Sequence, residues 1–135
     1  METVCWTEAM SVGVARIDEQ HKRLVQMINE LGQAIGAGRG QAAMHDIVGG
    51  MRLYAQEHFR TEEEAMSVSR FPGRTSHVSE HDAFVELVQD LEAALDQGGV
   101  VSATATWRFL WDWLANHIQG PDKVLGDHLC ACGRD

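Results

Sequence analysis

Five of the seven histidines fall at positions where helices would turn them inward, and two carboxylates accompany them. His77 and His81 are four residues apart, as are His58 and Glu62. On a helix, each pair would project from one face with Cβ atoms about 5 to 6 Å apart. That separation lets one metal ion, or a close pair of ions, bind both side chains. The chemistry indicated by these residue types is therefore metal binding.

The direction of the chain brings seven candidate ligands to one level. His58 lies near the end of its predicted helix and His77 near the start of the next, so both would lie at one end of a helical bundle. His21 begins the first predicted helix and His117 ends the fourth, which puts both at that same end. The candidate metal ligands are His21, His58, Glu62, His77, His81, His117 and Asp122.

A lone histidine on an apolar stripe is more often a satisfied core residue than a ligand, and one His-x-x-x-His pair proves little. Five histidines buried together without a metal would cost on the order of several kcal/mol in uncompensated polarity. Metal binding is therefore the favoured interpretation for the set. His45 and His128 have no comparable partners, and we interpret them as ordinary structural or surface histidines.

The donor set narrows the choice of metal. Five imidazoles and two carboxylates are too many for one tetrahedral zinc ion and too rich in nitrogen for calcium or magnesium. Two ions that share bridging carboxylates fit the count, and imidazole combined with carboxylate suits iron. The Glu-x-x-His motif of the di-iron carboxylate oxygenases and ferritins does not occur in the sequence.

Four long segments must position these residues. Apolar residues recur in them at three- and four-residue spacing, which is typical of amphipathic helices. Gly36 to Gly40, Arg70 to Gly73 and Asp96 to Gly99 mark the breaks. We expect an all-α fold, an antiparallel up-down four-helix bundle with an N-terminal arm, in which residues 1–135 form one domain. The predicted helices span about 17–36, 41–66, 74–96 and 101–120.

Charge and composition argue against several kinds of partner. The net charge of −9 and the pI near 5.1 disfavour nucleic acid and anionic membranes, which attract lysine- and arginine-rich patches. No stretch approaches the roughly 20 apolar residues of a membrane span, and no signal-peptide pattern begins the chain. Three cysteines, an odd number, suit a reducing compartment, so a cytoplasmic location is expected. Cys130 and Cys132 could bind a soft metal, but no further ligands flank them, so an exposed, poorly ordered tail is the favoured interpretation.

Pro121 stands where a helix should not have a proline, because it removes a backbone N–H and clashes with the carbonyl of His117. On a regular helix, His117 and Asp122 would be about 500° apart in rotation and point in different directions. A π-bulge turns less per residue and brings position five nearer the same face. The sequence therefore predicts a π-bulge or helix break at Ile118–Asp122 that aims Asp122 at the metal.

Four segments resemble the signature blocks of the hemerythrins, specifically the single-domain bacteriohemerythrins. They are VGVARIDEQHKRLVQMINEL, YAQEHFRTEEEAM, RFPGRTSHVSEHDAFV and WLANHIQGPDK. The resemblance extends from Trp6 to about Asp127, and all seven candidate ligand positions are filled at the family's spacing. Phe71 stands where the family often has tyrosine, a departure that touches no ligand.

The resemblance implies a non-haem di-iron site (Fe2+/Fe3+) that binds O2 reversibly. One iron would be held by the three-histidine group, which consists of His77, His81 and His117. The other would be held by the two-histidine group, His21 and His58, and would keep the open position for O2 as ligand. Glu62 and Asp122 would bridge the two irons together with a hydroxide or oxide. Leu114, Trp113 and Phe59 would form an apolar O2 pocket.

The function implied by the resemblance is O2 storage, transport or delivery by a monomer, without enzymatic activity. An O2 or redox sensor acting through an unidentified partner protein is one alternative. A di-iron peroxidase, or an enzyme that reduces NO or O2, is another. Asp18, three residues before His21, is interpreted either as the acceptor of that imidazole's second N–H or as an N-terminal helix cap.

Overall fold

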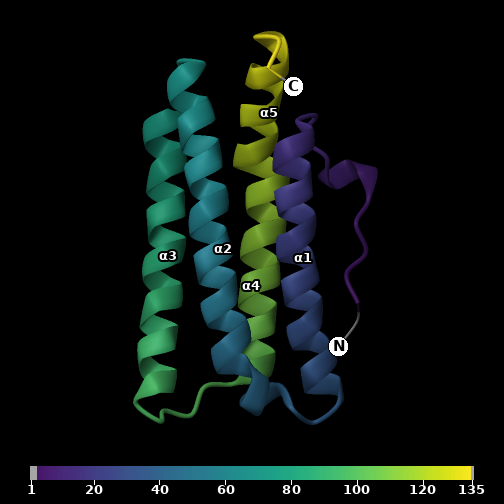
Figure 1. Cartoon of the computed structure of the whole chain (residues 1–135), viewed down its shortest axis with the longest axis vertical. Helices are drawn as coiled ribbons and strands as arrows, with labels where there is room; N and C mark the ends of the chain where they lie inside the picture. The colour runs from purple at the N-terminus through teal and green to yellow at the C-terminus, as the bar shows by residue number, and fades with distance from the viewer. Residues whose placement is uncertain (1–2, 135) are drawn as a thin grey trace.

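The computed structural model describes residues 3–134, which fold into helices joined by short loops (Figure 1). The long helices run alternately up and down, and an N-terminal arm lies along the first of them. The predicted all-α, antiparallel four-helix bundle is therefore confirmed. The elements are η1 (Glu8–Met10), α1 (Ala15–Gly36), α2 (Gly40–Val68), α3 (Arg74–Asp96), α4 (Ala103–His117), η2 (Ile118–Asp122) and α5 (Lys123–Ala131).

Glycines in the left-handed conformation end α1 and α3. Gly38 has φ +76° and Gly98 has φ +75°, values that cost glycine little because it lacks a Cβ atom. The N–H of the next residue then donates to a carbonyl of the last turn, as Gly99 does to Ala94 at 2.9 Å. Both turns lie at the lower end of the bundle in Figure 1.

The connection from α2 to α3 lies at the opposite end of the bundle (Figure 1). No glycine ends α2; instead Arg70 takes the left-handed conformation with φ +56°, and the N–H of Phe71 donates to the carbonyl of Met66 at 2.9 Å. This short connection sets the start of α3 beside the end of α2. The histidines of these two helices consequently lie at one level.

The apolar core is divided into two clusters by a buried polar layer. One cluster contains Leu24 and Phe59, and the other contains Ile17 and Met66. His21 lies between Ile17 and Leu24 on α1, and a buried carboxylate takes the matching place on α2. The helices therefore hold a slab of histidine and carboxylate groups between two apolar layers.

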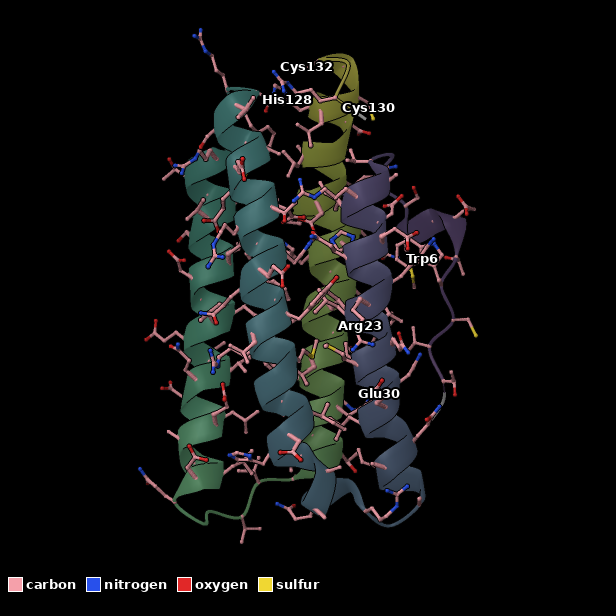
Figure 2. All side chains as sticks on the ribbon, viewed as in Figure 1. Trp6, Arg23, Glu30, His128, Cys130 and Cys132 are labelled. Carbon is pink, nitrogen blue, oxygen red and sulfur yellow. The ribbon has the colours of Figure 1, made fainter. Side chains whose placement is uncertain are left out.

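The C-terminal segment is a helix, and our expectation of a poorly ordered tail was wrong for its residues up to Ala131. Leu125 and Leu129 lie four residues apart and are both buried, which docks α5 on the bundle. A Cβ added to Gly126 would lie 2.1 Å from the carbonyl oxygen of Val12, so glycine permits this close approach to the arm. Cys130 and Cys132, which are labelled in Figure 2, are exposed near the end of α5.

The N-terminal arm is attached to α1 by polar contacts. Asn29 receives a hydrogen bond from the N–H of Val4 and donates one to its carbonyl, both at 2.8 Å. Trp6, on the arm beside α1 in Figure 2, has the ammonium of Lys22 5.5 Å from its ring centre. Among residues 3–134, no helix is both long enough and apolar enough to cross a lipid bilayer.

Candidate metal centre

All four long helices and the η2 segment contribute to the polar layer. The helix α1 contributes His21, and α2 contributes His58 and Glu62. The helix α3 contributes His77 and His81, α4 contributes His117, and η2 contributes Asp122. Each of these residues is at most 3% exposed. The structure thus brings together all seven predicted ligands, namely His21, His58, Glu62, His77, His81, His117 and Asp122.

The turn that carries Asp122 is a π-helix over Ile118–Asp122, with Pro121 inside it. The predicted π-bulge is confirmed. His117 and Asp122 are five residues apart, yet His117 Nε2 lies 3.0 Å from Asp122 Oδ1. The wider turn therefore puts positions i and i+5 on one face, which a regular α-helix would not do.

Glu62 faces both sets of imidazoles. Its Oε1 lies 3.0 Å from His81 Nε2 and 3.3 Å from His77 Nε2. Its Oε2 lies 3.2 Å from His58 Nε2 and 3.6 Å from His21 Nε2. One oxygen is thus turned to the three-histidine group and the other to the two-histidine group.

Asp122 divides its oxygens in the same way. Its Oδ1 lies 2.9 Å from His77 Nε2 and 3.0 Å from His117 Nε2. Its Oδ2 lies 2.8 Å from His21 Nε2. Two carboxylates that each present one oxygen to each group are arranged as bridges between two neighbouring centres.

These close approaches do not have the geometry of hydrogen bonds. Both oxygens of Glu62 and of Asp122, and Nε2 of three histidines, are buried without a hydrogen-bond partner in the described structure. Polar atoms left in this state cost free energy unless something else satisfies them. Cations placed between them would do so. The residues therefore fit a pair of metal ions, with donor sets Glu62, His77, His81, His117, Asp122 and His21, His58, Glu62, Asp122.

The electrostatics of the layer are dominated by its two carboxylates. Burial alone would lower the pKa of His21, His77 and His117, but contacts with Asp122 and Glu62 outweigh burial and raise each pKa to about 9. Burial would raise the pKa of Asp122, as would the charge of Glu62, yet imidazole contacts lower it to about 2. Since only neutral imidazole binds metal, an incoming cation must displace these protons.

Two of the imidazoles are oriented by side-chain contacts at Nδ1, the nitrogen that does not face Glu62. His58 Nδ1 lies 2.7 Å from Gln20 Oε1, and His81 Nδ1 lies 2.9 Å from Glu63 Oε2. Neither acceptor was predicted from the sequence. A weak signal existed, because each acceptor directly adjoins a predicted ligand.

The three predicted pocket residues lie around the layer in different ways. Phe59 stacks on His81, with ring centres 3.9 Å apart and planes within 7°. Trp113 stacks on His117 at 4.5 Å and 15°. Both aromatic rings therefore cover the three-histidine group. Leu114 is buried one turn before His117.

Asp18 has neither of the two roles considered for it. Its carboxylate accepts a hydrogen bond from the Ser11 hydroxyl at 2.6 Å and one from the N–H of Val12 at 2.8 Å. It therefore anchors the arm, and Val14 occupies the N-cap position of α1. The two histidines outside the predicted ligand set also lie elsewhere: His45 contacts Asp96, and His128 contacts the carbonyl of Ser69.

A helical bundle with a buried cluster of histidine and carboxylate side chains is the architecture of a class of cation-binding proteins. The model of the hemerythrin HHE cation-binding domain matches residues 12–129, and the chain belongs to the hemerythrin family. The resemblance inferred from the sequence blocks is thereby confirmed.

Relatives match over nearly the full chain. The bacteriohemerythrin of Methylococcus capsulatus is 31% identical over 132 residues, which cover 97% of this chain and 100% of that protein. The bacteriohemerythrin of Stenotrophomonas maltophilia is 29% identical and matched over 97% and 84%, respectively. A crystal structure of wild-type hemerythrin, 30% identical, superposes with a TM-score of 0.87 over 95% of this chain and 98% of that one.

Proposed function

We propose that this protein binds O2 reversibly at two iron ions with a bridging hydroxide or oxide, for O2 storage, transport or delivery. The observation that carries the proposal is the division of the carboxylate oxygens. Glu62 and Asp122 each offer one oxygen to the three-histidine group and one to the two-histidine group. Membership of the hemerythrin family supports iron as the metal, and the mixed imidazole and carboxylate donors suit it.

The two donor sets differ in the number of side chains that they contain. Five side chains surround the centre of the three-histidine group, and four surround that of the two-histidine group. An ion held by the two-histidine group would therefore have one protein ligand fewer, which would leave a position for an external ligand. When bound, the iron pair supplies the electrons and the open position that O2 requires. The chain itself fixes the donors.

Apolar side chains supply a dry environment. Leu114 is 3% exposed, and we place it in the lining of the O2 pocket. Phe59 and Trp113, which stack on imidazoles, would shield the three-histidine side from water. Restricted water limits proton delivery to the site, which favours release of O2 over its reduction.

The proposal is tested by loading metal-free protein with Fe2+ under argon and exposing it to O2. We expect about two irons per chain, one for each donor set, and a visible absorption that appears with O2 and disappears under vacuum over repeated cycles. Irreversible oxidation on first exposure would contradict reversible binding. Sustained turnover of O2, NO or peroxide with an added reductant, lost in His58→Ala, would indicate an enzyme instead.

A further inference from the structure

A chain of three hydrogen bonds leads from the backbone of α2 to the outer nitrogen of His58. The hydroxyl of Thr61 donates to the carbonyl of Glu57, with a distance of 3.3 Å. The amide nitrogen of Gln20, on α1, donates to Thr61 Oγ1 at 3.1 Å. The amide oxygen of Gln20 lies 2.7 Å from His58 Nδ1. The chain therefore begins and ends on α2 and passes through α1.

The direction of every bond in this chain is fixed by its first member. A backbone carbonyl can only accept, so the single hydroxyl proton of Thr61 is used on Glu57 and the hydroxyl oxygen is left to accept. It accepts from the amide nitrogen of Gln20, which turns the amide oxygen toward His58. That oxygen can only accept as well, so His58 Nδ1 must carry a proton.

A neutral imidazole has one N–H, and its other nitrogen holds a lone pair. With the proton on Nδ1, the lone pair of His58 lies on Nε2. That atom is buried without a hydrogen-bond partner and lies 3.2 Å from Glu62 Oε2. His21, the other member of the two-histidine group, has no partner at Nδ1 among the described residues. His58 is thus the imidazole of that group whose tautomer is set from outside.

We propose that Thr61 and Gln20 are positioning residues that hold His58 in the Nδ1–H tautomer and so present its Nε2 to the metal ion of the two-histidine group. This inference rests on the proposed metal pair. It differs from the arrangement at the three-histidine group, where His81 Nδ1 faces the carboxylate of Glu63 directly. A carboxylate accepts from the imidazole in any orientation, whereas an amide must be held oxygen-first, and Thr61 holds it.

The test measures the affinity of the metal-free protein for Co2+, by competition with a chromophoric chelator. Gln20→Leu removes the acceptor of His58 and should weaken binding of one of two Co2+ ions about 10- to 100-fold. Thr61→Val keeps the shape but frees the amide to turn, and should weaken the same ion about 2- to 10-fold. Thr61→Ser restores the hydroxyl and should restore the affinity.

Thr106→Val is the matched control. The Thr106 hydroxyl also donates to the carbonyl four residues earlier, that of Ser102, at 2.9 Å, but it lies at the start of α4 and joins no ligand. This variant should bind both Co2+ ions as the wild type does. Loss of affinity in Thr106→Val equal to that in Thr61→Val would overturn the positioning role.

Two outcomes separate this inference from the proposed function. A wild-type protein that fails to bind two Co2+ ions would refute the metal pair itself. A wild-type protein that binds two, with Gln20→Leu and Thr61→Val binding equally well, would refute the positioning role alone. A 1H–15N spectrum of the Zn2+-loaded wild type gives a readout that needs no variant. We expect the His58 proton on Nδ1, and a proton on Nε2 would overturn the proposal.

Discussion

Glu62 and Asp122 contact both ligand groups, whereas each imidazole belongs to one group. Removal of a shared carboxylate should therefore release both ions, and removal of one imidazole should release one. After anaerobic loading and desalting, we expect Glu62→Ala to retain almost no iron and His58→Ala to retain about one iron per chain, that of the three-histidine group. Elemental analysis measures both. Equal iron contents in the two variants would show that Glu62 is not shared.

Leu114 and Leu110 are a matched pair for testing the O2 pocket. Both are buried on α4, at 3% and 1% exposure, one turn apart. Truncation of either to alanine should lower the free energy of unfolding by about 2 to 5 kcal/mol, which urea denaturation measures. We expect faster irreversible oxidation of the iron-loaded protein in Leu114→Ala, because water enters beside the site. Equal oxidation rates in the two variants would remove Leu114 from the pocket.

Individual residues differed in how far the sequence could locate them. The convergence of His77 and His81 with His117 was predictable, because helical periodicity fixes which side chains turn inward. Gln20 and Glu63 were not, since they lie beside the inward stripe and their contacts depend on how neighbouring helices are rotated. The same holds for Asp18, whose partners lie on the arm, a segment without periodicity.

At the scale of elements, breaks in the chain were the most predictable features. The ends of α1 and α3 were visible as glycines in the sequence, because a turn with φ near +75° favours glycine. Pro121 indicated the π-helix at Ile118–Asp122. The break at Arg70 to Gly73 indicated the end of α2, but the residue that takes the left-handed conformation there is Arg70 and not a glycine, which the sequence did not show. The helix α5 was missed because the proline suggested an end, although the π-helix passes directly into it.

His45 near the start of α2 and Asp96 at the end of α3 form an exposed contact of 2.5 Å between the two helices. The hydrogen bond and the charge of Asp96 raise the pKa of His45 above its ordinary value of 6.5. Because the folded state holds this proton more tightly, the stabilisation is complete below pH 6.5 and is lost as the pH rises through the folded pKa.

An NMR titration of the His45 ring protons should therefore give a pKa above 6.5 in the wild type and a lower pKa in Asp96→Asn, in which Asp46 still lies beside the ring. The free energy of unfolding of the variant should also fall less than that of the wild type as His45 is deprotonated. A wild-type pKa at or below 6.5 would mean that the contact does not persist in solution.

At the scale of the whole molecule, the bundle is built around a layer that cannot satisfy its own polar atoms. Each metal ion that binds only the folded state should stabilise it by about 2.7 kcal/mol at a free concentration of 100 times its Kd, so two ions should contribute about twice that. For a chain of 135 residues the two ions together correspond to a rise in Tm of about 20 °C. Thermal unfolding under argon, with Fe2+ and then with a chelator, measures it. Glu62→Ala is the control and should show no rise.

We propose that seven side chains hold two ions that share Glu62 and Asp122. Diffraction from crystals of the iron-loaded protein, recorded at the iron absorption edge, tests it most directly. We expect two anomalous peaks about 3.5 to 4 Å apart. One peak should lie among His77, His81 and His117, and the other beside His21 and His58. Each peak should lie next to one oxygen of Glu62 and one oxygen of Asp122. A single peak, or peaks outside this layer, would contradict it.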